Sequence, residues 1–142
     1  MIFLKYRDLH IHKLDTKWFY FGSMMGGSYK TLAHLAVHAK RNNIRIIFNP
    51  STYLAAKGHR PLRKILQATD ILVLNDEEAQ LVTGKKMDVR SLLHELRSFG
   101  PVIVVITCGP KGAHAFDGNI HYQVKPHRIK VVEASGAGDA FA

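Results

Sequence analysis

The residues best suited to chemistry stand in the last segment of the sequence, residues 135–142 (SGAGDAFA). Gly136 and Gly138 let the backbone approach a ligand closely, because no side chain stands in the way. If Asp139 lies in a first helical turn, the free amides of Gly136, Ala137 and Gly138 point at one spot and can bind a phosphate. Beside such an anion site, Asp139 fits a general base that deprotonates an attacking hydroxyl. The alternative is a glycine turn with an acidic helix start.

Asn75 and Glu78 form a second candidate pair, three residues apart after an apolar run. An amide and a carboxylate at a strand end can position phosphate oxygens and a hydrated Mg²⁺, with Glu78 acting on the metal through water. The same spacing also predicts a capping box, in which Asn75 caps a helix and Glu78 reaches back. Both interpretations stay open from the sequence alone.

A glycine loop, Thr107-Cys-Gly-Pro-Lys-Gly, follows the apolar run VIVVIT. Ligands of open α/β folds collect at the carboxyl ends of strands, so Thr107 and the amides around Gly109 and Gly112 could hold nucleotide phosphates. Two glycines after a strand are also typical of a simple tight turn. Cys108 is the one cysteine, which excludes an internal disulfide, and no base is paired with it, so we interpret it as an ordinary thiol.

The nine histidines raise the question of a metal site. His34 and His38 are one helical turn apart, and His10 and His12 would share one face of a strand. No cysteine or carboxylate completes either pair at a familiar spacing, so we expect surface histidines.

The elements that must position these residues alternate between short apolar runs and amphipathic helical patterns, which predicts an α/β fold with a mostly parallel sheet. Strands are expected at 18–23, 44–49, 70–75 and 102–107. Helices are expected at 28–41, at 54–68 with interruptions at Gly58 and Pro61, at 76–82, and after Asp88 up to Gly100. An antiparallel hairpin is expected from 113–116 and 120–124, then a strand at 129–133 and a glycine-opened helix from 135.

Composition restricts the class of protein. The 142 residues suffice for one domain, with 46% hydrophobic and 22% charged residues. No apolar run reaches the roughly 18–20 residues that span a bilayer, and charges within the first ten residues argue against a signal peptide, so a soluble cytoplasmic protein without a membrane partner is expected. The net charge of +9 favours an anionic partner. The basic residues are scattered and no nucleic-acid motif is visible, so we favour a nucleotide, with a basic nucleic-acid-binding domain as the weaker alternative.

Four stretches together resemble the ribokinase-like (PfkB-type) carbohydrate kinases. They are FNPS at 48–51, DILVLNDEEAQLVTG at 70–84, VIVVITCGPKGA at 102–113 and SGAGDAFA at 135–142. The resemblance implies a Rossmann-type, mostly parallel sheet flanked by helices, with a terminal hairpin. It implies an ATP-dependent phosphotransferase that acts with Mg²⁺ on a hydroxyl of a sugar or nucleoside.

The resemblance also assigns roles. Asp139 would be the catalytic base, and Gly136, Ala137 and Gly138 the anion hole. Asn75 and Glu78 match the family's Asn-x-x-Glu motif for phosphate and Mg²⁺ placement. The nucleotide loop is matched by Thr107, Gly109 and Gly112.

The chain departs from the family pattern at Glu133 and Ala134, where the family usually has Asp-Thr. This departure would affect how the Gly-Ala-Gly-Asp loop is positioned, or a monovalent-cation site near it. It therefore motivates the alternative of a catalytically silent nucleotide-binding or interaction protein. By the resemblance, residues 1–142 are one partial kinase domain, incomplete at both ends and inactive alone. Residues 16–142 would be the α/β core, residues 1–15 the remnant of a lid strand, and the full-length parent is compatible with a homodimer.

Overall fold

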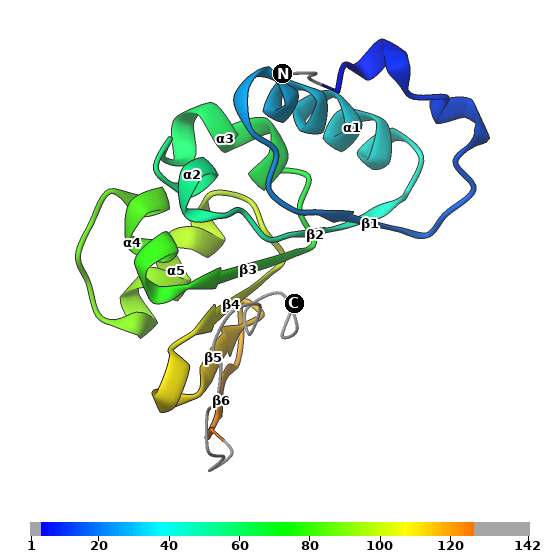
Figure 1. Ribbon diagram of the computed structural model, residues 1–142. Coiled ribbons are helices and arrows are strands. Elements are labelled where there is room, and N and C mark those ends of the chain that lie inside the picture. The colour runs from blue at the N-terminus through cyan, green and yellow to red at the C-terminus, as the bar shows by residue number, and fades with distance from the viewer. Residues whose placement is uncertain (1–3, 127–142) are drawn as a thin grey trace.

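A computed structural model of the protein describes residues 4–126, which contribute six strands to one sheet in the order β1-β2-β3-β4-β5-β6 (Figure 1). Four neighbouring strands are parallel: β1 (Trp18–Phe21), β2 (Arg45–Phe48), β3 (Ile71–Asn75) and β4 (Ile103–Thr107). The antiparallel hairpin of β5 (Ala113–Phe116) and β6 (His121–Val124) completes the sheet. The expected α/β architecture, with a mostly parallel sheet and a hairpin, is confirmed.

The helices follow the strands as the apolar spacing predicts. They are α1 (Tyr29–Arg41), α2 (Thr52–Ala55), α3 (His59–Leu66), α4 (Asp76–Thr83) and α5 (Val89–Ser98). Helix α1 buries Leu32, Leu35, Ala36 and Ala39, which share one helical face. Asp88 caps α5, because its carboxylate accepts the backbone N–H groups of the second and third helical residues.

One expected interruption is wrong. Gly58 separates α2 from α3 with a φ of 74°, a conformation that glycine adopts without strain. Pro61, however, lies inside α3 as its third residue. The first turn of a helix has no intrahelical partner for its N–H groups, so a proline there costs no hydrogen bond.

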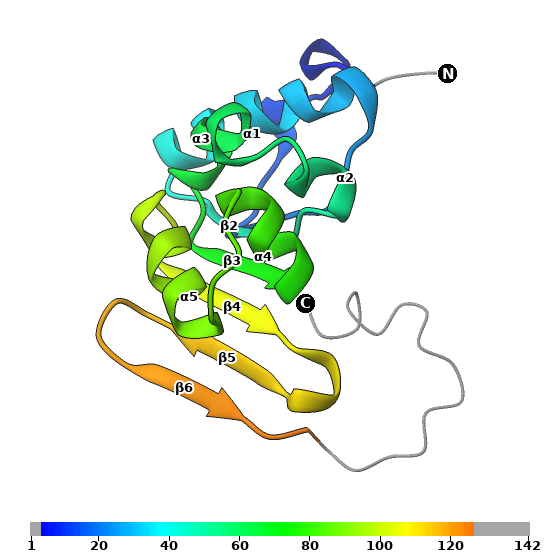
Figure 2. The same cartoon turned by 90° about the vertical axis from the view of Figure 1, so that its left-hand side faces the viewer.

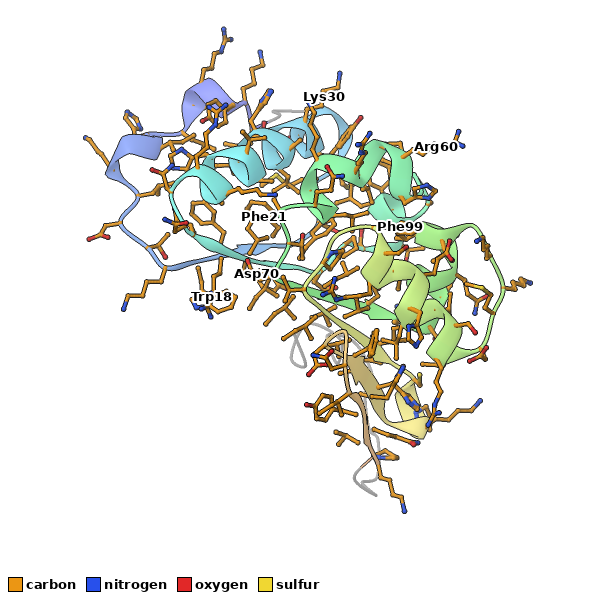
Figure 3. All side chains as sticks on the ribbon, turned by 180° about the vertical axis from the view of Figure 1, so that it is seen from behind. Trp18, Phe21, Lys30, Arg60, Asp70 and Phe99 are labelled. Carbon is orange, nitrogen blue, oxygen red and sulfur yellow. The ribbon has the colours of Figure 1, made fainter. Side chains whose placement is uncertain are left out.

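The five α-helices cover one face of the sheet (Figures 1 and 2). Side chains alternate along the strands, so Phe21, Leu72 and Leu74 point into this helix-covered side and are buried. Figure 3 shows Phe21 directed towards the helices and Trp18 directed away from them. Within residues 4–126 no helix covers the opposite face. We call this surface the open face. Its apolar side chains on β1 to β4 are Trp18, Tyr20, Ile47, Ile71, Val73, Ile103 and Val105, and the Arg45 guanidinium lies over the Trp18 ring.

The first described residues form two short 3-10 helices, Tyr6–Asp8 and Ile11–Lys13. The expected strand that would place His10 and His12 on one face is therefore wrong, since these residues turn instead of extending. The segment is fixed to α1, where the Thr31 hydroxyl donates to the Leu4 carbonyl at 2.8 Å. The assignment of residues 1–15 as a lid remnant stays a prediction.

The expected strand at 129–133 and helix from 135 lie outside the described residues. None of the helices found within residues 4–126 has both the length and the apolar character needed to cross a bilayer.

Candidate active site

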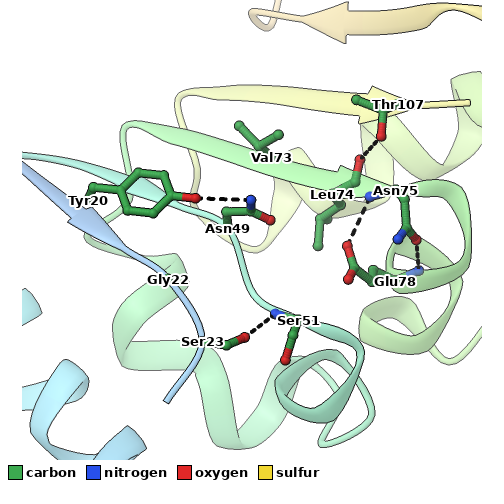
Figure 4. Close-up of a pocket in the computed structure, with 10 residues that line it drawn as sticks. All are labelled: Tyr20, Gly22, Ser23, Asn49, Ser51, Val73, Leu74, Asn75, Glu78 and Thr107. Carbon is green, nitrogen blue, oxygen red and sulfur yellow. Dashed lines mark hydrogen bonds between the residues drawn. The ribbon is translucent and has the colours of Figure 1, made fainter. Parts of the chain in front are cut away.

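The parallel register brings two predicted site residues together. Asn75 ends β3 and Thr107 ends β4, and the two are direct partners in the sheet. They share a cavity of about 410 Å³ at the carboxyl ends of the strands, beside the open face (Figure 4). The cavity is lined by Tyr20, Gly22, Ser23, Asn49, Ser51, Val73, Leu74, Asn75, Glu78 and Thr107. Three of the predicted residues, Asn75, Glu78 and Thr107, thus meet in one place.

The capping box predicted from Asn75 and Glu78 is present. The backbone N–H of Glu78 donates to Asn75 Oδ1 at 2.8 Å, and the backbone N–H of Asn75 donates to Glu78 Oε2 at 3.0 Å. The cap uses the oxygen of the Asn75 amide and leaves its Nδ2 group facing the cavity, without a protein acceptor in the described residues. Capping and ligand binding are therefore compatible at this residue.

Glu78 is a buried carboxylate, only 8% exposed. Burial raises the pKa of its carboxyl above the usual value, and the hydrogen bond from the Asn75 backbone opposes part of that rise. The Thr52 hydroxyl lies 3.5 Å from Oε1, a long contact. A carboxylate that is held by its own helix cap and faces a polar cavity fits a hydrated Mg²⁺, whose waters would donate to it.

The start of α4 is acidic, and one of its three carboxylates, Glu78, lines the cavity. Asp76, Glu77 and Glu78 all lie in the first turn of α4. Three carboxylates repel a bare phosphate, so an anion bound beside them needs a divalent cation for compensation.

Thr107 lines the cavity, whereas the glycines of the loop that follows it do not. Thr107 lines the cavity, and its hydroxyl makes only a long contact of 3.4 Å to the Leu74 carbonyl. Gly109 begins a 3-10 turn, Gly109–Lys111, and Gly112 follows it, and neither glycine lines the cavity. The turn closes on itself, because the Cys108 N–H donates to the Gly112 carbonyl at 2.7 Å. The tight-turn interpretation thus accounts for the loop geometry, and a nucleotide role for its amides stays a prediction.

We expect Gly112→Ala to destabilise the protein more than Gly109→Ala. Both glycines have positive φ, 91° and 52°. A Cβ on Gly112 would lie 2.0 Å from the Val124 carbonyl oxygen, whereas one on Gly109 would meet no atom within 4 Å. Gly109→Ala should therefore lower the free energy of unfolding only by the left-handed backbone strain, about 1–2 kcal/mol. Gly112→Ala should lower it by more, because β6 must also move. Urea unfolding of both variants measures the difference. Equal losses would contradict this structural requirement at Gly112.

Sequence reasoning assigned no role to four polar residues of the cavity: Tyr20, Ser23, Asn49 and Ser51. Asn49 Nδ2 donates to the Tyr20 hydroxyl at 3.1 Å, and the Ser51 N–H donates to Ser23 Oγ (Figure 4). The sequence did indicate Asn49–Ser51, because these residues belong to FNPS, one of the four stretches that carry the family resemblance. Tyr20 and Ser23 gave no signal, because a tyrosine in an apolar run suggests a buried strand.

Cys108 and the His34–His38 pair both lie within the described residues. Burial, with a smaller contribution from the Asp76 charge, raises the pKa of the Cys108 thiol, which makes the thiolate scarce. His34 and His38 both lie on α1, where His34 packs edge-on against Tyr6. No group of three or more histidine, cysteine or acidic side chains in residues 4–126 could hold a metal ion. The predicted catalytic residues Gly136, Ala137, Gly138 and Asp139 lie outside the described residues.

Curated proteins similar to this chain are kinases of small hydroxylated molecules. Cytidine kinase of Thermococcus kodakarensis is 36% identical over 109 residues, which cover 72% of this chain and 38% of that protein. Deoxyribokinase of Salmonella typhi is 28% identical over 116 residues, covering 79% of this chain and 37% of its own length. The chain thus spans about two fifths of the length of these relatives.

Solved structures with the same fold include a candidate ribokinase II from Escherichia coli in complex with ATP and Mg²⁺. It superposes with a TM-score of 0.80 at 21% identity and covers 97% of this chain and 47% of that structure. At this identity the likeness shows the fold. A family description, pfkB family carbohydrate kinase, matches residues 16–142. This match covers nearly the whole sequence, and the chain therefore belongs to the PfkB family of carbohydrate kinases.

Proposed function

We propose that this chain forms part of an ATP-dependent kinase that transfers the γ-phosphoryl group to an alcohol hydroxyl of a sugar or nucleoside. The observation that supports this most is the cavity in which Asn75, Glu78 and Thr107 meet, in a chain of the PfkB family. Relatives named for cytidine and deoxyribose support a small hydroxylated acceptor. The hydroxyl and amide groups of Tyr20, Ser23 and Asn49 suit such a ligand.

Each cavity residue has a distinct task in this proposal. Asn75 Nδ2 and the Thr107 hydroxyl donate to phosphate oxygens. Glu78 accepts hydrogen bonds from the waters of Mg²⁺ and so fixes the cation that neutralises the phosphates beside α4. Bound Mg²⁺ supplies the charge compensation that phosphoryl transfer requires.

The proton and the transferred group are handled by residues 136–139 in this proposal. The Asp139 carboxylate takes the proton from the acceptor hydroxyl as its oxygen forms the new bond to phosphorus. The bond from the γ-phosphorus to the bridging oxygen of ATP breaks, and ADP leaves. The amides of Gly136, Ala137 and Gly138 donate to the oxygens of the transferring group, where negative charge must be stabilised.

The experiment that tests the metal assignment uses Glu78→Gln in a full-length parent kinase. Glutamine keeps an oxygen that accepts the Asn75 N–H, so the capping box survives, but the negative charge is lost. We expect the Mg²⁺ concentration for half-maximal rate to rise by about tenfold or more, with little change in melting temperature.

Matched variants separate capping from catalysis. Asn75→Ala removes the cap and should cost about 0.5–2 kcal/mol of stability. Asn75→Asp keeps an N-cap acceptor, removes the Nδ2 donor and adds a negative charge beside the proposed phosphate site. An unchanged Mg²⁺ titration in Glu78→Gln, together with a lowered melting temperature in Asn75→Ala, would show that the pair is a helix cap only.

A panel of sugars and nucleosides, with ATP turnover as the readout, tests the class of function. Nucleotide binding without turnover on any acceptor would favour the silent nucleotide-binding protein suggested by Glu133 and Ala134. Binding to unrelated oligonucleotides that weakens steeply with salt would favour the nucleic-acid alternative.

A further inference from the structure

A pair of histidines lies outside the proposed kinase cavity. His94 is on α5 and His121 is the first residue of β6, and their Nε2 atoms are 3.0 Å apart. Neither residue lines the cavity of Asn75 and Glu78. The two positions are 27 residues apart in the sequence, which explains why histidine spacing gave no indication of the pair.

The rings are held in place by the core beneath them. Phe116 is only 5% exposed and is the direct partner of His121 in the hairpin. The His121 ring stacks on the Phe116 ring with a centroid distance of 4.4 Å, and the His94 ring lies 4.3 Å from the same ring. Helix α5 packs against β4 and β5. The nitrogens are therefore preorganised, which lowers the entropic cost of binding a ligand.

The distance between the two nitrogens is compatible with binding of one metal ion by both. With metal–nitrogen bonds of about 2.0–2.1 Å, nitrogens 3.0 Å apart subtend about 91–97° at the metal. That angle matches two adjacent positions of a square-planar or octahedral ion, whereas a tetrahedral ion would need nitrogens about 3.3–3.4 Å apart. Tetragonal geometry with nitrogen ligands is typical of Cu²⁺ and Ni²⁺.

We propose that His94 and His121 form a two-histidine site for a divalent late transition ion of tetragonal preference, with water in its remaining positions. Neutral imidazoles can present both Nε2 lone pairs by carrying their protons on Nδ1. Binding therefore requires a tautomer change in one imidazole and a rotation of both rings, which turns the lone pairs from the line between the nitrogens towards the metal. The nearby Asp117 is already engaged, because its Oδ1 accepts the N–H groups of Asn119 and Ile120. The competing explanation is a hydrogen bond between the two imidazoles that has no affinity for metal.

The test is a Ni²⁺ titration of a full-length kinase that contains this sequence, with folding checked by circular dichroism. Single variants His94→Gln and His121→Gln each remove one ligand, and we expect each to weaken Ni²⁺ binding by at least about tenfold. The matched control is His38→Gln, which breaks the His34–His38 pair on α1 and should leave the affinity unchanged.

Two further readouts do not depend on the variants. Paramagnetic Ni²⁺ should broaden the ring signals of His94 and His121 before those of the other histidines. It should also raise the melting temperature of the wild-type full-length kinase, because only the folded state joins α5 to β6. Equal affinities in the wild type and His94→Gln, affinity lost in His38→Gln, or first broadening at His34 and His38 would each overturn the proposal.

Discussion

Asp139→Asn in a full-length kinase that contains this sequence is expected to lower kcat by about 10²–10⁴-fold. Asparagine is nearly isosteric with aspartate but cannot accept the proton of the attacking hydroxyl. The proposed nucleotide contacts, from Asn75 and Thr107, are made elsewhere and are untouched by the change. The affinity for ATP should therefore change far less than the rate.

Single-turnover phosphoryl transfer and a separate ATP-binding measurement check this expectation. Asp117→Asn is a matched control of the same chemistry, since Asp117 lies in the loop between β5 and β6 and asparagine keeps the Oδ1 acceptor used there. Turnover of Asp139→Asn within a factor of about three of the wild type would remove Asp139 from the role of base.

Residues 1–142 on their own are expected to show no sugar-kinase activity and to be only marginally folded. The reason is the open face, because parallel sheets are stable when both faces are covered. Trp18 and Tyr20 on this face are 39% and 52% exposed, and Ile47, Ile71 and Ile103 are only partly buried. An acceptor bound beside this face would also stay open to water, so hydrolysis of ATP would compete with transfer.

The measurement compares the 142-residue chain with a full-length parent for ATP-dependent phosphorylation across sugars and nucleosides. Trp18 is the single tryptophan and reports directly on the open face. Its emission should be that of a water-exposed indole in the short chain and should shift to the blue in the parent. Robust transfer by the short chain, or a cooperative unfolding transition as stable as that of the parent, would contradict the expectation.

The sequence by itself determined the elements whose causes are local. The spacing of Leu32, Leu35, Ala36 and Ala39 predicts the buried face of α1, because a helix places these positions together whatever surrounds it. The capping box of Asn75 and Glu78 is equally local, since both partners lie within one helical turn.

The two errors in the predicted elements have different causes. The prediction at Pro61 failed because the effect of a proline depends on where the helix begins, and α3 begins only two residues before it. The strand expected near His10 and His12 failed because the backbone closes a turn there, in which the Lys13 N–H donates to the His10 carbonyl.

Only the tertiary structure decided which distant residues meet. Tyr20, Asn49 and Thr107 share one cavity because the parallel register of β1 to β4 aligns the carboxyl ends of these strands. The order of the strands in the sheet cannot be deduced from local sequence patterns. The same holds for Gly112, whose need for glycine comes from the Val124 carbonyl on the next strand. His94 and His121 meet because α5 packs over the hairpin. Local patterns are fixed by backbone geometry within a few residues, whereas these contacts depend on how the sheet buries its apolar side chains as a whole.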